Sequence, residues 1–398
     1  MILINVSLLL KMCSITVTMY NNKPDCRYNF LIIGLISLSG IVFYVSSSVP
    51  LNFHNWRSLH RGWLPTKNTL ENASSSGNIS FDENRYDKMS KAPSGNICRP
   101  QHNFVFIKTA KTGGSTLSSM LYRYGLKNNL VAALNPNNTS FIDSDDNGNL
   151  ILKEYNCHNF SKYNFMASHV TYNRQAMDMV IENAKYFTIL RSPVTHWKSH
   201  FYFSGKDKAY PKTSNPFERY LNEQYARHYN GHTVKPFFNG YCNRFGISYE
   251  EDTQTIKRHL ERLDNELDLV LLMEYYDESL ILLKQLMCWD FEDILYYPMK
   301  VHKTKQPPIT LEMTRQISQL ARYDIRLYEY FNSSFWSKIE NYNGDFQADL
   351  KHFKNLKQDI FDHCENERDS QYCNLLMTDT NKMAKLVSKK NKKKCMVL

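Results

Sequence analysis

The chain has 398 residues, of which 42% are hydrophobic and 13% aromatic, enough for one large domain or two modest ones with a well-buried core. The formal net charge is +10, but seven lysines between positions 382 and 394 leave only +3 for the rest of the chain. The body of the protein is therefore not a general nucleic-acid-binding surface, and we expect residues 381–398 to be a solvated basic tail.

Near the N-terminus, residues 28–53 contain no charged side chain, and their apolar centre FLIIGLISLSGIVFYV is long enough to cross a membrane as a helix. Three basic residues precede this stretch, whereas the first basic residue after it, setting histidine aside, is Arg57. The positive-inside rule then places residues 1–27 in the cytosol and the remaining chain across the membrane. We predict an uncleaved signal anchor at residues 28–49; the alternative is a cleaved signal peptide.

Residues 50–97 are rich in Asn, Ser and Gly, lack apolar periodicity, and are predicted to form a stem. The following N-glycosylation sequons agree with a lumenal body: Asn72, Asn78, Asn137, Asn138, Asn159 and Asn332. Some of the cysteines after the anchor should pair in an oxidising lumen, and Cys364 and Cys373 are the candidates for a local pair. The start of translation, Met1 or Met19, is left open.

From residue 98 onwards the pattern alternates between strands and helices. Strands are predicted at 104–108, 165–170 and 186–190, and helices at 115–125, 177–184 and 193–203, with Gly125 as the cap of the first helix. This alternation indicates a parallel sheet with helices on its faces. The second half is predicted to be mostly helical, at 252–266, 277–289 and 309–331, around one buried strand at 269–273.

The segment FVFIKTAKTGGSTL, residues 104–117, joins the first strand to the first helix through a glycine loop. Backbone N–H groups at the glycine turn and at the helix N-terminus, together with Lys111, form a cradle for a phosphate-type anion. The loop is not a Walker A motif, because Gly114 is followed by Ser115 and not by a Lys-Ser/Thr pair. We therefore do not expect an ordinary nucleoside triphosphate.

A second segment, YFTILRSPVTHWKSHF at residues 186–201, carries Arg191 at the end of a buried strand and Ser199 eight residues later in a helix. The C-terminal edge of an open α/β sheet is where such folds bind ligands. A guanidinium and a hydroxyl that converge there can clamp a second phosphate. For Arg191 alone, a structural salt bridge is the alternative.

These segments carry a resemblance to a known family. The pattern K-T-x-K-T-G-G-S-T after a strand, and L-R-S-P followed by Ser199, resemble the nucleotide-binding core of sulfotransferases, which use 3′-phosphoadenosine 5′-phosphosulfate (PAPS). FIKTAKTGGSTL, FTILRSP and LLMEYYDESLILLKQLMCW (271–289) are more closely similar to Golgi galactose-3-O-sulfotransferases, over about residues 103–331. The resemblance implies an α/β, P-loop-like sulfotransferase fold with a central parallel sheet flanked by helices and a mostly helical C-terminal part.

The resemblance also implies roles for single residues. The 5′-phosphosulfate would be held by Lys111, Thr112, Gly113, Gly114, Ser115 and Thr116, and the 3′-phosphate by Arg191 and Ser199. Lys111 would also neutralise the charge that develops on the leaving phosphate. Lys108 and Thr109 lie at the strand end, where Lys108 either contacts the donor or serves the structure. This chemistry requires no metal.

A general base must take the proton of the acceptor hydroxyl. The candidate is His169 in FMASHV, because it ends the second predicted strand, between the two donor segments, and a histidine near this place serves as base in related carbohydrate sulfotransferases. The alternative is a core or surface histidine. The rival bases are His158, His200 and Glu274, the last of which can equally cap a helix or form a structural pair.

Two other segments match known functional motifs, but their sequence context argues against those functions. Residues 143–154 match the spacing of an EF-hand calcium loop, but Pro136 and two sequons argue against an entering helix, so we expect a polar turn. The C-terminal Cys395-Met-Val-Leu resembles a prenylation box, which a lumenal C-terminus would rule out.

The sequence thus predicts a single-pass type II Golgi membrane enzyme. Its lumenal domain, residues 98–380, would transfer sulfuryl from PAPS to a carbohydrate hydroxyl, above all the 3-OH of a β-galactose on a glycolipid or glycoprotein. One alternative is a Golgi sulfotransferase for another sugar, such as a glycosaminoglycan uronic acid, against which the low charge of the body argues. The other is a non-catalytic lumenal binding protein with the same fold. Acceptor identity and oligomeric state are left open.

Overall fold

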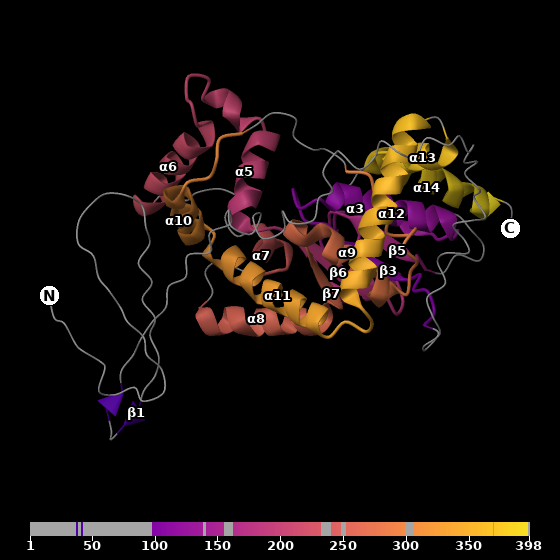
Figure 1. Cartoon of the computed structure of the whole chain (residues 1–398), viewed down its shortest axis with the longest axis horizontal. Helices are drawn as coiled ribbons and strands as arrows, with labels where there is room; N and C mark the ends of the chain where they lie inside the picture. Colours follow the sequence, from indigo (N-terminus) through magenta and orange to yellow (C-terminus); the bar gives the residue numbers. More distant parts are fainter. Residues whose placement is uncertain are drawn as a thin grey trace, which may run out of the picture. The chain divides into compact units, whose positions relative to one another are not determined.

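The computed structural model describes residues 37–38, 41–42, 98–137, 141–154, 162–231, 240–247, 252–298, 306–368 and 370–396, with side chains between residues 98 and 392 (Figure 1). Within the predicted anchor, β1 (Ser37–Leu38) and β2 (Ile41–Val42) pair in antiparallel fashion. The rest of the anchor, residues 1–27 and the stem lie outside the described residues. No helix of the described residues is both long and apolar enough to cross a membrane. The anchor therefore stays a prediction.

Five parallel strands form the central sheet in the order β4-β5-β3-β6-β7. Their bounds are β3 (Phe104–Ile107), β4 (Ala132–Ala133), β5 (Phe165–Ser168), β6 (Lys185–Leu190) and β7 (Leu269–Leu272). The four predicted strands and their parallel arrangement are confirmed, and β4 is an addition that is too short to show a pattern. In the register, Ile107 of β3 pairs with Ser168 of β5 and Thr188 of β6. The loops after these three strands consequently lie side by side.

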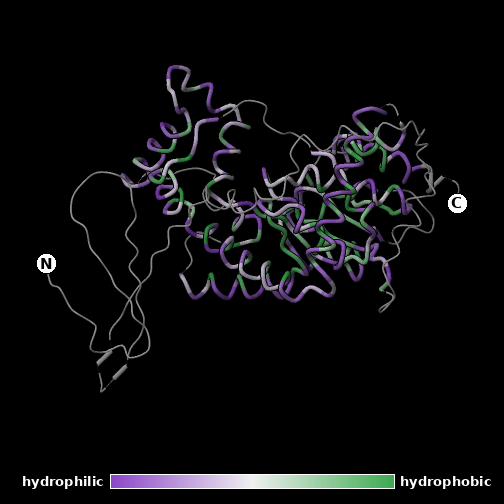
Figure 2. Tube along the Cα trace, viewed as in Figure 1, coloured by the Kyte–Doolittle hydropathy of each residue, from purple (hydrophilic) through white to green (hydrophobic). Residues whose placement is uncertain are grey.

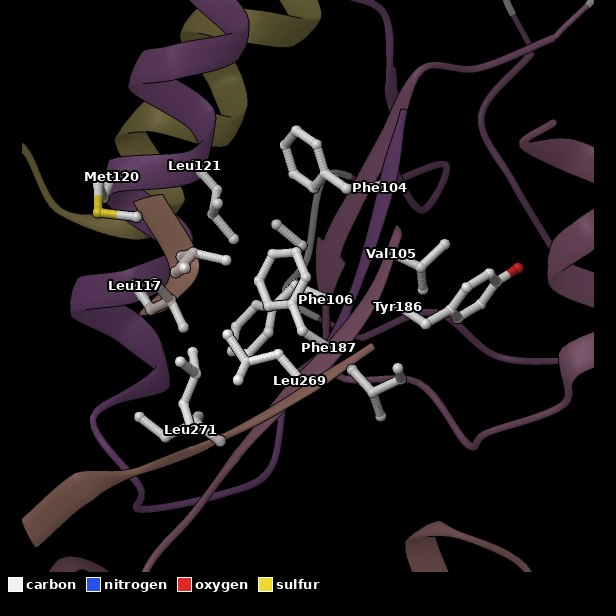
Figure 3. Close-up of a cluster of buried hydrophobic side chains, with 14 of the residues drawn as sticks. Phe104, Val105, Phe106, Leu117, Met120, Leu121, Tyr186, Phe187, Leu269 and Leu271 are labelled. Atoms are coloured by element: carbon white, nitrogen blue, oxygen red, sulfur yellow. The ribbon is translucent and has the colours of Figure 1, made fainter. Parts of the chain in front are cut away.

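Each strand of the sheet sends alternate side chains to opposite faces. Figure 3 shows Phe104, Phe106 and Phe187 directed toward α3 (Gly114–Lys127), whereas Val105 and Tyr186 point to the opposite side. On this second side the Tyr186 hydroxyl donates a hydrogen bond to Asp178 of α4 (Arg174–Val180), 2.7 Å away. Green hydrophobic segments accordingly gather around the sheet in Figure 2, while the outer face of α8 (Thr253–Glu266) is largely purple and hydrophilic.

A second hydrophobic cluster lies apart from the sheet, between α5 (Pro193–Phe203), α6 (Pro216–Tyr229) and α10 (Leu311–Leu320). Trp197 and Phe201 of α5 are buried in it together with Phe217 and Ile317. This packing fixes α5, the helix that follows Arg191. The remaining described elements are η2 (Lys206–Ala209), α7 (Gly240–Arg244), η3 (Met273–Tyr275), α9 (Tyr276–Met287), α11 (Arg322–Glu340), α12 (Phe346–Asn366), α13 (Gln371–Met377) and α14 (Thr380–Met396).

Two helix predictions are wrong in detail. Gly125 does not cap α3, which continues to Lys127; a Cβ at Gly125 would lie 2.4 Å from the Phe165 ring, so the glycine permits a close approach between helix and sheet. The single helix predicted at 309–331 is in fact two helices, because the helical conformation is interrupted at Ala321 between α10 and α11.

The lysine-rich C-terminus also differs from the expected solvated tail. Residues 380–396 form α14, which lies beside α3 (Figure 1). Met383 and Val387 are buried against the core, whereas Lys382, Lys385 and Lys389 are exposed. The described part of the predicted tail therefore belongs to the folded domain.

Two disulfides crosslink the described part of the chain. The predicted Cys364–Cys373 pair is confirmed, and an unpredicted bond joins Cys98 to Cys288 across 190 residues. Of the predicted sequons, Asn137 is exposed in a turn and Asn332 is half-buried within α11. The other four sequons lie outside the described residues.

Candidate functional site

The loop between β3 and α3 has two residues in the left-handed region, Lys111 at φ 59° and Gly113 at φ 78°. Gly113 cannot carry a side chain here, because a Cβ would lie 2.5 Å from the Met273 sulfur and 3.0 Å from the Tyr276 ring. Helix α3 begins at Gly114 with no side-chain cap and no acid in its first turn. Its N-terminal N–H groups and the positive end of its dipole are thus available to an anion.

Two hydroxyls of the loop serve its structure. The Thr109 hydroxyl donates to the Ile189 carbonyl and lies 2.9 Å from the Thr112 hydroxyl, which also bonds the Thr109 carbonyl. Both threonines are buried, and Thr112 and Thr116 are not among the residues that line the cavity described below. The Thr109 and Thr112 side chains therefore hold the loop against β6.

The second predicted segment meets this loop directly. Arg191 donates from Nη1 to the Lys111 carbonyl, 3.3 Å away, and from Nε to the Thr195 hydroxyl, 2.9 Å away. Glu274 accepts from the backbone N–H of Ser192 at 2.8 Å and from the Tyr328 hydroxyl at 3.1 Å. Glu274 thus has the structural role that was the alternative to its being a base.

The two segments enclose a cavity of about 650 Å³, which we call the donor cavity. Most of the predicted site residues line it: Lys108, Thr109, Lys111, Gly113, Gly114, Ser115, His169, Arg191 and Ser199. Its lining carries five basic side chains, Lys108, Lys111, Arg191, Lys198 and Arg244, and no Asp or Glu among the described residues. Such a cavity suits a ligand with several negative charges.

Lys198, Arg244, Thr380 and Asn381 line the donor cavity without having been predicted. Lys198 could have been predicted from the sequence, because positions 195, 198 and 199 lie on one face of the helix that follows Arg191. Burial, aided by the charge of Arg191, lowers the pKa of Lys198, whose ammonium donates to the Pro307 carbonyl. No sequence motif indicated that Arg244, Thr380 or Asn381 would line the cavity.

His169 follows β5 at the edge of the donor cavity. Its Nδ1 lies 2.8 Å from the Lys108 carbonyl oxygen, which can only accept, so Nδ1 carries the proton and Nε2 is the basic nitrogen of the neutral ring. The ring stacks on Phe141 at a centroid distance of 4.7 Å. His169 is therefore held in the tautomer and orientation that suit a general base.

Of the rival bases, His200 also lines the donor cavity, and its pKa is lowered by burial and by the charges of Lys206 and Lys111. His158 lies outside the described residues.

The EF-hand-like segment is the expected polar turn. One oxygen of Asp145 accepts from the backbone N–H groups of Asn147 and Asn149 at 2.9 and 2.8 Å, and Ser144 bridges Leu150 in antiparallel fashion. Among the residues that the structure describes, no group of three or more His, Cys, Asp or Glu side chains could hold a metal ion.

The chain is similar in sequence to known proteins of one family. The profile of the galactose-3-O-sulfotransferase family matches residues 27–379, which include the whole donor cavity except its α14 wall. Bovine galactosylceramide sulfotransferase is 30% identical over 271 residues, 63% of this chain and 61% of that protein. The human galactosylceramide sulfotransferase is 28% identical over 335 residues, 80% of this chain and 74% of that protein. Mouse galactose-3-O-sulfotransferase 2 is 26% identical over 258 residues, 60% of this chain and 63% of that protein. The chain thus spans about three fifths of the bovine relative.

Proposed function

The chain belongs to the galactose-3-O-sulfotransferase family, and we propose that it transfers a sulfuryl group from PAPS to a hydroxyl of a galactose-containing carbohydrate. The observation that carries this proposal is the donor cavity, where five basic side chains meet without an acid among the described lining residues, beside the oriented His169. Sulfuryl transfer from a nucleotide needs this combination of charge stabilisation and a base.

The donor would be held by two separate arms. The uncapped start of α3, with Lys111, Gly114 and Ser115, binds the 5′-phosphosulfate, and Arg191 with Ser199 binds the 3′-phosphate. The bond from Arg191 to the Lys111 carbonyl supports this assignment, because it holds the arms at a fixed separation. A second phosphate arm is what distinguishes this donor from ATP.

The chemistry is an in-line displacement at sulfur. The acceptor oxygen forms a bond to the sulfur as the bond from sulfur to the 5′-phosphate oxygen breaks, and His169 Nε2 takes the hydroxyl proton. Lys111 and the N–H groups at the start of α3 stabilise the charge that develops on the departing phosphate. The protein contributes position and charge, and no covalent intermediate is needed.

We further propose the 3-OH of a β-galactose on a glycolipid as the acceptor, since the relatives above are galactosylceramide sulfotransferases and a galactose-3-O-sulfotransferase. The signal anchor at residues 28–49 would hold the domain in the Golgi lumen as a type II membrane protein. The disulfides Cys98–Cys288 and Cys364–Cys373 support an oxidising compartment.

The test is calorimetric titration of 3′-phosphoadenosine 5′-phosphate (PAP) into the full-length protein in detergent. Lys111→Ala and Arg191→Ala should each weaken binding by at least about tenfold, while Lys351→Ala, at an exposed position of α12, removes the same charge without effect. Equal binding by all four proteins would refute the donor site.

A radiolabelled-sulfate transfer assay then separates the alternatives. Transfer to galactosylceramide supports the proposal, transfer to uronic acids but not to galactose indicates the other sugar class, and PAP binding without transfer indicates the non-catalytic binding protein.

A further inference from the structure

The lysine-rich helix α14 presents a basic face to solvent. Lys382, Lys385 and Lys389 are exposed and recur at spacings of three and four residues, so they lie along one side of the helix. The opposite side of α14 is buried against the core. Residues 380–398 contain no Asp or Glu that could neutralise these charges from within the segment. We call the three exposed lysines the lysine face.

The fold makes little use of the lysine face. Lys385 and Lys389 form no ion pair with the described part of the chain, and Lys382 lies 4.0 Å from Asp379, where both side chains are exposed. An exposed pair at that distance contributes little to stability. Lys390 differs, because it donates to a backbone carbonyl near the end of α3, 2.6 Å away, and thereby fastens the two helices. The three charges of the lysine face are thus available to a partner.

The lysine face begins beside the donor cavity. Thr380 and Asn381, at the start of α14, line that cavity, and Asn381 lies one helical turn before Lys385 on the same side of the helix. From Lys382 to Lys389 the face extends for about 10 Å, at 1.5 Å per residue. A partner bound to this face is therefore held next to the donor cavity.

The composition of the face favours a lipid surface over an anionic polysaccharide. Every basic residue after Asp379 is a lysine, whereas arginine is the residue whose fork matches single sulfate or carboxylate groups. Leu386 lies among the three lysines and is 42% exposed. An apolar side chain gains free energy by contact with lipid and gains none from a hydrated polysaccharide. Lysines with an interspersed apolar residue are typical of segments that bind anionic membranes.

Helix α14 also lies beyond the part of the chain that the family profile matches, since that profile ends at residue 379. The donor loop, Arg191 and His169 all lie within the matched region. The lysine face is therefore separate from the features on which family membership rests.

We propose that the lysine face of α14 docks the domain on an anionic lipid surface and so holds the donor cavity near the membrane. The inference goes beyond the proposed function and does not depend on it. Each lysine close to a negatively charged bilayer strengthens binding by about fivefold, so three lysines together provide about 100-fold. The proposed reaction would itself supply such lipids, because a sulfuryl group makes an uncharged galactolipid anionic.

The experiment measures how fast individual lysines of the full-length protein react with a membrane-impermeant acetylating reagent, with mass spectrometry as the readout. The protein is reconstituted into vesicles of phosphatidylcholine alone or of equimolar phosphatidylcholine and phosphatidylserine. The lysine face should be acetylated at least about threefold more slowly in the anionic vesicles, and high salt should abolish the difference by screening. Lys351, exposed on α12, is the internal control and should react equally in both.

A double variant tests whether the charges cause the docking. Lys385→Gln/Lys389→Gln should shift the docking equilibrium by about 25-fold, so that Lys382 reacts at nearly the same rate in both kinds of vesicle. The matched control, Lys257→Gln/Lys351→Gln, removes two exposed lysines from α8 and α12 and should leave the protection of Lys382 as in the wild type. An unchanged midpoint of denaturant unfolding shows that both variants are folded.

Three results would overturn the inference. They are equal acetylation of the lysine face in neutral and anionic vesicles, protection of Lys382 that persists in Lys385→Gln/Lys389→Gln, and protection by heparin in detergent without any effect of phosphatidylserine, which would assign the face to a polysaccharide. If phosphatidylserine protects the lysine face while no transfer from PAPS occurs, the docking surface stands and the proposed function fails.

Discussion

Arg191 Nη1 lies 3.3 Å from the backbone carbonyl oxygen of Lys111, a bond that joins two segments separated by 80 residues. Through it, the strand-end arginine fixes the loop in which Lys111 has a left-handed backbone conformation. The guanidinium is thus both a charge for the ligand and a support for the loop. A lysine at this position has one nitrogen and cannot replace both donors of the fork.

The first prediction concerns Arg191→Lys, which keeps the charge but loses the fork. We expect the affinity for PAP to fall by about tenfold to a hundredfold, and the affinity for adenosine 5′-phosphate to fall less, because that ligand lacks the 3′-phosphate. Calorimetric titration of both nucleotides into wild type and variant measures the difference. Equal losses for the two ligands would show that Arg191 acts only through the loop.

The second prediction concerns His169→Asn, because an asparagine amide can still donate to the Lys108 carbonyl but cannot take a proton. The turnover number should fall by about 100-fold to 10,000-fold, with PAP affinity unchanged.

The matched variant for His169 is His200→Asn, which alters the other histidine of the donor cavity. Pre-steady-state transfer rates of both variants decide between the two bases. If His200→Asn is the slower enzyme, His200 and not His169 takes the proton.

The sequence was informative where local patterns decide the structure. The buried strands, the glycine loop and Arg191 are each encoded within a few residues, so their positions at one edge of a parallel sheet followed from strand order alone. The Cys364–Cys373 bond belongs to the same class, since its partners are nine residues apart.

Features that depend on distant contacts could not be predicted. The Cys98–Cys288 bond spans 190 residues, and Arg244 enters the site on a five-residue helix held by Asp324, with no motif around it. Gly125 looks like a helix cap in sequence, but the approach of the Phe165 ring explains it, and that contact is tertiary.

The third prediction concerns Asp324, whose burial raises its pKa to about 7. Because this value lies above the unfolded pKa of about 4, the folded state favours the protonated acid, and stability falls as the pH rises from about 4 to about 7. The amide of Asp324→Asn does not titrate, so the free energy of unfolding of this variant should fall less than that of the wild type over the same pH range. Denaturant unfolding at several pH values measures it.

The control for Asp324→Asn is Asp359→Asn, at an exposed position of α12, which should keep the wild-type slope. If the free energy of unfolding of Asp324→Asn depends on pH as steeply as that of the wild type, Asp324 has the same pKa in the folded and the unfolded state.

The last prediction concerns α14, which the sequence alone suggests is a solvated tail. Its apolar face buries Met383 and Val387, and the Thr380 hydroxyl donates to the Ser115 carbonyl at 2.7 Å, next to the donor loop. Met383→Ala should therefore lower the free energy of unfolding by about 2–5 kcal/mol, because it leaves a cavity in the core. Replacing the exposed lysines 382, 385 and 389 by Gln should change it by less than about 0.5 kcal/mol.

Denaturant unfolding of the two variants, paired with PAP titration, separates the two views of this segment. A docked helix predicts that the apolar substitution destabilises the protein while the triple lysine substitution leaves both stability and PAP affinity near wild type. A solvated tail predicts that neither Met383→Ala nor the triple lysine substitution changes the free energy of unfolding appreciably. Thr380→Val adds a direct link to function: it removes the bond to Ser115, so PAP affinity should fall by about threefold to tenfold at nearly unchanged stability, since one hydrogen bond that positions the loop is lost.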